Sequence, residues 1–158
     1  MKKKVQENFF LTKNNMNIDL DNLLRKLLYE ETNLPILYHG TNTDKVTGYK
    51  NYKGIYLTAD PNYAKRFGKN IFKVKAYLKN PYILELPNEF GFEGAFSLDN
   101  QIILYRDLTD EDIENIKAHN YDGIVVYVKG ELPSGEKWIQ PLEVVVFDRN
   151  QIEVLGKI

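Results

Sequence analysis

The chain has 158 residues, no cysteine, and 21 basic against 22 acidic side chains, which gives a formal net charge of −1. This length fits one domain with a proper core, and the missing cysteines exclude disulfides, zinc-thiolate sites and thiol nucleophiles. The near-zero charge demands neither nucleic acid nor a membrane as partner. No apolar run is long enough to span a bilayer, and the basic start lacks the apolar stretch of a signal peptide. We therefore expect a soluble, cytoplasmic monomer.

Residues 1–34 are predicted to be an N-terminal segment of their own. A polar stretch comes first, and leucines then recur at helical spacing, at Leu20, Leu23, Leu24, Leu27 and Leu28. This pattern predicts an amphipathic helix that packs on a core formed by residues 35–158. Pro35 prevents the helix from continuing into that core.

Two short strands are predicted next. Residues 36–38 read as a buried strand, and the turn residues 39–42 follow it, so that His39 would stand at the end of the strand. Residues 54–58 read as the second strand.

A short helix and two further strands come after residue 58. Asp60 can cap the helix, Pro61 suits its first turn, and Gly68 lies just past its end. From residue 70 to residue 79 apolar side chains alternate with polar ones, which is typical of a half-exposed strand. Residues 82–86 read as the next strand.

The second half of the chain is predicted to hold an irregular segment, one helix and three strands. Residues 87–100 carry aromatics and glycines without a period, which indicates an ordered excursion that is neither helix nor strand. Thr109 and Asp112 resemble a capping box at a helix start. Strands are predicted at residues 123–128, 143–147 and 151–155, with a turn-rich loop at residues 129–141. These elements together predict an α+β domain dominated by short strands.

Candidate chemistry lies on three of these elements. His39 follows the first strand, Tyr56 lies in the second, and Glu143 opens the most apolar strand of the chain. Taken singly, a histidine at a strand end is usually structural and a tyrosine in a strand is usually part of the core. A carboxylate at the head of such a strand is costly unless it is used or paired.

These residues, in this order, resemble the His-Tyr-Glu class of ADP-ribosyltransferases, which includes diphtheria-toxin-like enzymes and small domains of phage polyvalent proteins. The resemblance covers roughly residues 35–158. Its strings are YHGT at residues 38–41, KGIYLTAD at 53–60, YDGIVV at 121–126, and EVVVFD at 143–148 with Gln151 and Ile152 after it. The resemblance implies an α+β, ADP-ribosyltransferase-like fold with a split β-sheet core of short strands and peripheral helices.

The resemblance also implies roles toward NAD, the co-substrate of the class. His39 would bond ribose hydroxyls, the backbone of Gly40 would hold the nicotinamide carboxamide, and Thr41 would lie near the adenosine ribose. Tyr56 and Phe67, eleven positions apart, match the two aromatic rings that sandwich the nicotinamide. Such stacking suits a cationic pyridinium.

Glu143 matches the catalytic glutamate of the class. Loss of nicotinamide leaves positive charge on the ribose, and a fixed carboxylate that bonds the 2′-hydroxyl stabilises this transition state more than the ground state. Arginine-modifying relatives carry a second glutamate two residues earlier, where this chain has Pro141. Gln140 and Trp138 are candidate acceptor contacts in the loop where relatives recognise their targets, although an indole packed over the sheet is an equal alternative for Trp138.

The resemblance therefore implies a mono-ADP-ribosyltransferase that transfers ADP-ribose from NAD to a macromolecule, to protein in preference to nucleic acid. It needs no metal, and the sequence has no metal-ligand cluster and no Rossmann fingerprint. A phage or toxin effector acting in a host cytoplasm would fit. Two alternatives stay open: an NAD glycohydrolase, with water as acceptor, and a non-catalytic binding module on the same fold.

Overall fold

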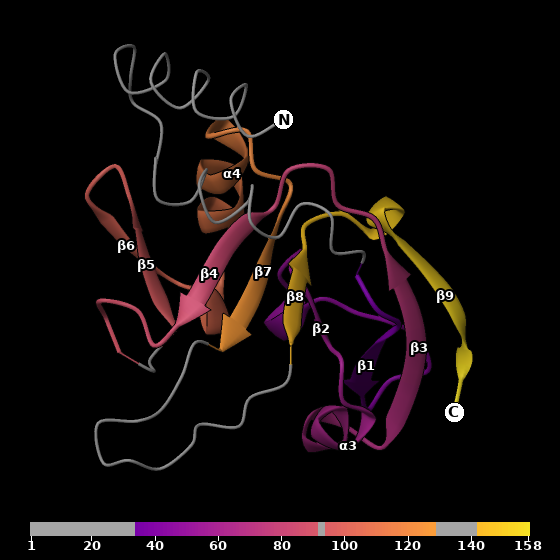
Figure 1. Ribbon diagram of the computed structural model, residues 1–158. Coiled ribbons are helices and arrows are strands. Elements are labelled where there is room, and N and C mark those ends of the chain that lie inside the picture. The colour runs from indigo at the N-terminus through magenta and orange to yellow at the C-terminus, as the bar shows by residue number, and fades with distance from the viewer. Residues whose placement is uncertain (1–33, 92–93, 129–141) are drawn as a thin grey trace, which may run out of the picture. The chain divides into compact units, whose positions relative to one another are not determined.

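A seven-stranded mixed sheet organises the part of the chain that the computed structural model describes, which is residues 34–91, 94–128 and 142–158. In sheet order its strands are β4 (Tyr82–Leu86), β7 (Gly123–Val128), β8 (Glu143–Val146), β2 (Ile55–Thr58), β1 (Leu37–Thr41), β3 (Asn70–Ala76) and β9 (Ile152–Lys157) (Figure 1). β4 and β7 are parallel, and every other neighbouring pair is antiparallel. The predicted N-terminal helix, Trp138 and Gln140 lie outside the described residues.

Short helices and a hairpin surround this sheet. The hairpin consists of β5 (Ala95–Leu98) and β6 (Gln101–Leu104). The helices are α3 (Pro61–Ala64) and α4 (Asp110–Ala118), with 3-10 turns η1 (Tyr49–Asn51), η2 (Lys65–Phe67), η3 (Tyr105–Asp107) and η4 (Arg149–Gln151). Short strands with peripheral helices confirm the predicted α+β fold class. Among the described residues, no helix has the length and apolarity needed to cross a membrane.

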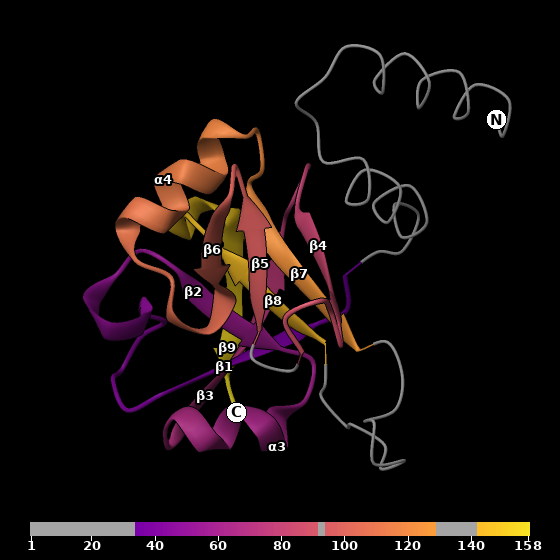
Figure 2. The same ribbon diagram turned by 90° about the vertical axis from the view of Figure 1, so that its left-hand side faces the viewer.

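The main core lies between one half of the sheet and the elements that cover it. Figure 2 shows α4 and the β5–β6 hairpin over the half formed by β4, β7 and β8. The buried cluster there joins side chains from all of these elements, including Leu84, Phe96, Ile113, Ile124 and Val145. Consecutive residues of β7 and β8 are buried, whichever face of the sheet they point to, and this agrees with the continuous apolar runs in their sequences.

The sheet opens between β1 and β2. Other antiparallel neighbours in it share four or five register positions, but β1 and β2 share only one, between Tyr38 and Thr58. Beyond that position the two strands have no further register pair. The side chain of His39 on β1 bonds the backbone carbonyl of Tyr56 on β2 instead. This opening is the split in the sheet, and it leaves room for a pocket.

Two local predictions were wrong. Residues 39–41 do not turn, because every residue of β1 pairs with β3 and this ladder outweighs the turn preference of Gly40. His39 therefore lies inside a strand. Residues 95–98 are not irregular but form β5, and Asp99 and Asn100, both with positive φ, make the two-residue turn into β6.

The helix starts and several of the strands follow the predictions, whereas β6 was not predicted. Asp60 caps α3 with Pro61 in its first turn, and the η2 turn carries the helix on to Gly68. Thr109 and Asp112 form the predicted capping box of α4. β4 and β7 have the predicted bounds, and the alternation along β3 buries one face and exposes the other.

Candidate active site

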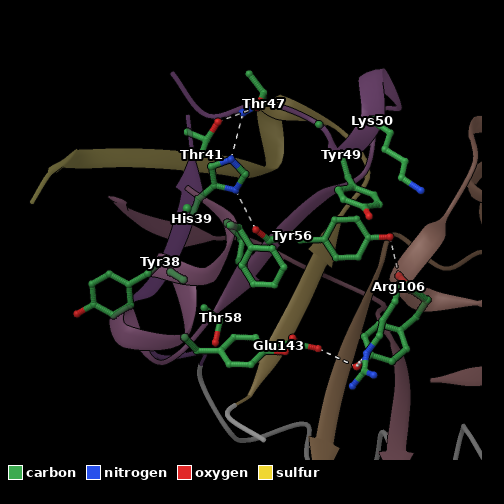
Figure 3. A pocket seen from close by; sticks show the side chains of 17 residues that line it. Tyr38, His39, Thr41, Thr47, Tyr49, Lys50, Tyr56, Thr58, Arg106 and Glu143 are labelled. Atoms are coloured by element: carbon green, nitrogen blue, oxygen red, sulfur yellow. Dashed lines mark hydrogen bonds between the residues drawn. The ribbon is translucent and has the colours of Figure 1, made fainter. Parts of the chain in front are cut away.

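A pocket of about 420 Å³ lies at the opening between β1 and β2 (Figure 3). This volume is in the usual range for small-molecule sites. All six candidate residues that the structure describes line it, and they are His39, Gly40, Thr41, Tyr56, Phe67 and Glu143. They come from β1, β2, η2 and β8, so the fold brings together residues more than a hundred positions apart in the chain.

His39 is held on both ring nitrogens. Its Nδ1 lies 2.9 Å from the carbonyl oxygen of Tyr56, and the backbone N–H of Thr47 donates to its Nε2 at 3.3 Å. A carbonyl only accepts, so Nδ1 carries the hydrogen and Nε2 is an acceptor. Burial lowers the pKa of His39, although its bond to the Tyr56 carbonyl works the other way. The imidazole is therefore neutral, and His39 lines the pocket.

Gly40 and Thr41 shape the wall beside His39. A Cβ added to Gly40 would lie 1.9 Å from the carbonyl oxygen of Ala64, so α3 packs directly on the β1 backbone. The Thr41 hydroxyl is 7% exposed and lies 3.0 Å from that of Thr43. Gly40 is thus required by helix packing, whatever its backbone binds.

The two aromatic candidates differ in how firmly they are held. The Tyr56 ring packs on the main core, and its hydroxyl donates to the Tyr105 carbonyl oxygen at 2.6 Å. Phe67 is 54% exposed and makes an edge contact with Tyr63. Tyr56 is therefore a fixed wall of the pocket, and Phe67 is an open one.

Glu143 lies in a network of hydroxyl and guanidinium groups. The Tyr105 hydroxyl donates to its Oε2 at 2.8 Å and accepts from Arg106 Nε at 2.9 Å. Burial raises the pKa of Glu143, while bonds from Tyr105 and Tyr63 and the charge of Arg106 oppose this rise. The carboxylate predicted to be costly is thus paired, at the edge of the pocket.

Sequence reasoning missed several residues that line this pocket, chiefly Tyr63, Tyr105, Arg106, Tyr49 and Lys50. Tyr63 could have been found, because it precedes Phe67 by one helical turn. Nothing in the sequence marked Tyr105 and Arg106, since they stand in a three-residue turn without a period. Lys50 and Tyr49 lie in η1, which residue spacing did not reveal either.

A split sheet with a pocket at its opening, a histidine on β1, an aromatic wall on β2 and a paired carboxylate on β8 is the architecture of an ADP-ribosyltransferase domain. Residues 30–155 match the family model described as ADP-Ribosyltransferase in polyvalent proteins, and the chain belongs to this family. A comparison with curated proteins finds no match. Membership supports ADP-ribosylation as the general class of reaction, with NAD as the co-substrate that such enzymes use. Within the described residues, no group of three or more ligand side chains could hold a metal ion.

Proposed function

We propose that this protein is a mono-ADP-ribosyltransferase that cleaves NAD at the nicotinamide–ribose bond and transfers ADP-ribose to a protein acceptor. The observation that carries this proposal is the convergence of His39, Tyr56, Phe67 and Glu143 on one pocket. The cysteine-free composition supports action in a reducing cytoplasm. The family description, which names polyvalent proteins, is compatible with a phage or toxin effector acting in a host cell.

The nicotinamide ring would lie between Tyr56 and Phe67. Both rings line the pocket, as do Tyr49 and Tyr63, which make edge contacts with Tyr56 and Phe67, so the lining is rich in aromatic surface for a third ring. A rigid Tyr56 and an exposed Phe67 would let the ring enter and leave past Phe67.

The ribose and the phosphates would meet polar groups of complementary character. Neutral His39 can accept a hydrogen from a ribose hydroxyl at Nε2, because its contact with Thr47 is long and easily exchanged. Lys50 and Arg106 outnumber Glu143 among the charged groups of the lining, which favours a dinucleotide with two negative phosphates.

Glu143 would act on the sugar. Nicotinamide leaves with the electron pair of the C–N bond, and the acceptor atom then bonds to the ribose carbon and loses its proton. The carboxylate faces the positive charge that develops between these events and is held before the reaction begins. Its contribution therefore belongs to the transition state, and its loss lowers kcat more than it raises KM.

The test is incubation of the purified chain with labelled NAD and a cell lysate, with free nicotinamide and label on protein measured together. The parent chain should produce both, and Glu143→Gln should reduce both by at least about a hundredfold, in line with other electrostatic stabilisers. Glu111→Gln, an exposed position on α4, is the matched control and should change neither.

The alternatives give distinct results in the same experiment. Nicotinamide without labelled protein favours an NAD glycohydrolase, label on nucleic acid replaces the proposed acceptor, and neither signal favours a non-catalytic binding module. Any of these three results would contradict the proposal.

A further inference from the structure

The η3 turn contacts Tyr56 and Glu143, two of the side chains that the proposed function places at the nicotinamide end of NAD. From one side, the Tyr56 hydroxyl donates to the carbonyl oxygen of Tyr105 at 2.6 Å and accepts from the N–H of Leu108 at 3.1 Å. Two backbone groups therefore fix the far end of the Tyr56 ring.

From the other side, the Tyr105 side chain reaches Glu143. Its hydroxyl has one hydrogen, and the Arg106 Nε–H that approaches at 2.9 Å can only donate. The hydroxyl must therefore accept from Arg106 and aim its hydrogen at Glu143 Oε2, 2.8 Å away. Arg106 sets the direction of this bond, and Figure 3 shows Arg106 beside Glu143.

Tyr105 itself is immobilised. Its side chain is fully buried, and its N–H donates to the carbonyl oxygen of Gly94 at 2.9 Å. A Cβ added to Gly94 would lie 2.2 Å from the tyrosine ring, so the ring rests directly on that backbone. Tight packing of this kind leaves the hydroxyl one position.

We propose that Tyr105 is a positioning residue, which fixes and polarises the Glu143 carboxylate through its hydroxyl while its backbone carbonyl fixes Tyr56. This inference rests on the proposed function, since it gives the held carboxylate its purpose. One residue of η3 thus sets the geometry between the ring that stacks on nicotinamide and the group that faces the ribose.

The hydroxyl also affects the charge state of the carboxylate. Burial raises the pKa of Glu143, and the groups that oppose this are Tyr105 and Arg106 on η3 and Tyr63 on α3, while Tyr56 of β2 adds no charge at neutral pH. Removal of the Tyr105 hydroxyl therefore raises the pKa of Glu143 further. The acid limb of the rate profile should move to higher pH.

Tyr105→Phe separates the two contacts. It removes the hydroxyl but keeps the ring and the carbonyl that holds Tyr56. We expect kcat to fall between about tenfold and about a hundredfold, as for a hydrogen bond to a charged group, with KM for NAD unchanged and the acid limb shifted upward. Tyr77→Phe is the matched control, because it removes a tyrosine bond to Glu153 of 2.9 Å outside the pocket.

A second readout needs no turnover. The carboxyl carbon of Glu143 can be followed by ¹³C NMR through a pH titration of the folded chain, with its resonance assigned by its loss in Glu143→Gln. The pKa of Glu143 should be higher in Tyr105→Phe than in the parent. Arg106→Met, at an exposed residue, should shift it in the same direction without a change in the core.

The outcomes separate the two proposals. A parent chain that turns over no NAD overturns the proposed function, and the titration then still decides whether Tyr105 controls the carboxylate. An unmoved titration of Glu143 overturns the positioning role, and so does a Tyr105→Phe variant in which KM rises and kcat and the acid limb stay as in the parent.

Discussion

His39 connects the two halves of the opening in the sheet. Its Nδ1–H bonds the carbonyl of Tyr56 on β2, and its Nε2 accepts from Thr47 in the segment between the strands. An uncharged imidazole satisfies both contacts, whereas a protonated one would set two N–H groups against each other at Thr47. The side chain therefore serves the fold as well as the pocket, and protonation opposes both.

This predicts a pH dependence of stability. Burial lowers the pKa of His39, so as the pH falls below the ordinary value for histidine the unfolded chain binds a proton there and the folded chain does not. The free energy of unfolding should fall through that window until the lowered pKa is passed. His39→Asn keeps a donor for the Tyr56 carbonyl and should remove this slope, measured by urea unfolding between about pH 7 and pH 5.

His119 is the internal control, since its shift has the opposite sign. The backbone bond with Asn115 and the contact with Asp99 together raise the pKa of His119, and burial opposes them. Its contribution to stability is therefore present below the ordinary value and lost as the pH rises through the raised one. His119→Asn should leave the His39 slope in place or steepen it. A loss of stability toward low pH that persists in His39→Asn would contradict the assignment to His39.

Single residues of the site could be predicted only where a string carries them. His39, Tyr56 and Glu143 stand in strings with a recognisable order, and each lies at the pocket. Tyr105 and Arg106 had no such signal, because what makes them relevant is contact with β8 and β2, far from them in the chain. Nothing short of the fold supplies that contact.

At the scale of elements, α3 is set by one missing side chain. The carbonyl of Ala64 occupies the place where a Cβ of residue 40 would stand, 1.9 Å away, and backbone cannot yield as a flexible side chain does. Gly40→Ala should therefore push α3 and η2 off β1 and move Phe67. We expect a loss of about 1–3 kcal/mol in the free energy of unfolding, typical of overpacking, and a higher KM for NAD.

Gly54→Ala is the matched control for this substitution. Its nearest contact would be a side-chain carbon at 3.4 Å, which is close to ordinary packing. Denaturant unfolding and NAD kinetics of both variants test whether the packing of α3 on β1 requires glycine at residue 40. Equal stability of Gly40→Ala and the parent would mean that the packing of α3 does not depend on the close contact between the Ala64 carbonyl and Gly40.

Elements were predictable where local chemistry and tertiary structure agree. α4 has a capping box and an apolar stripe. β7 is an apolar run whose first four residues are all buried, whichever face of the sheet they point to. The predicted range of β1 ends too early because a Gly-Thr-Asn string favours a turn. What extends the strand is its pairing with β3, whose residues lie far along the chain. β5 was missed because Asp99 and Asn100 were not read as a hairpin turn, although both tolerate positive φ.

At the scale of the whole molecule, the buried carboxylate of Glu143, which has a catalytic role in the proposed function, lowers the free energy of unfolding at neutral pH. Burial raises its pKa, so the folded chain binds a proton there more readily than the unfolded chain does. The free energy of unfolding therefore falls as the pH rises from the ordinary glutamate range through the raised value, and at neutral pH the carboxylate is a net cost. Glu143→Gln should be slightly more stable than the parent at neutral pH while it loses turnover.

NAD should stabilise the folded chain even when the chemistry is disabled. Because the proposed role of Glu143 is at the transition state, Glu143→Gln should still bind NAD and keep it intact during a thermal melt. At NAD concentrations about a hundredfold above Kd, linkage gives about 2.7 kcal/mol, or roughly 5–11 °C in Tm for a domain of this size. Phe67→Ala in the same background removes one wall of the pocket and should reduce the shift. If NAD left the melting temperature of Glu143→Gln unchanged, the carboxylate would be needed for ground-state binding and the division of labour proposed for the site would be wrong.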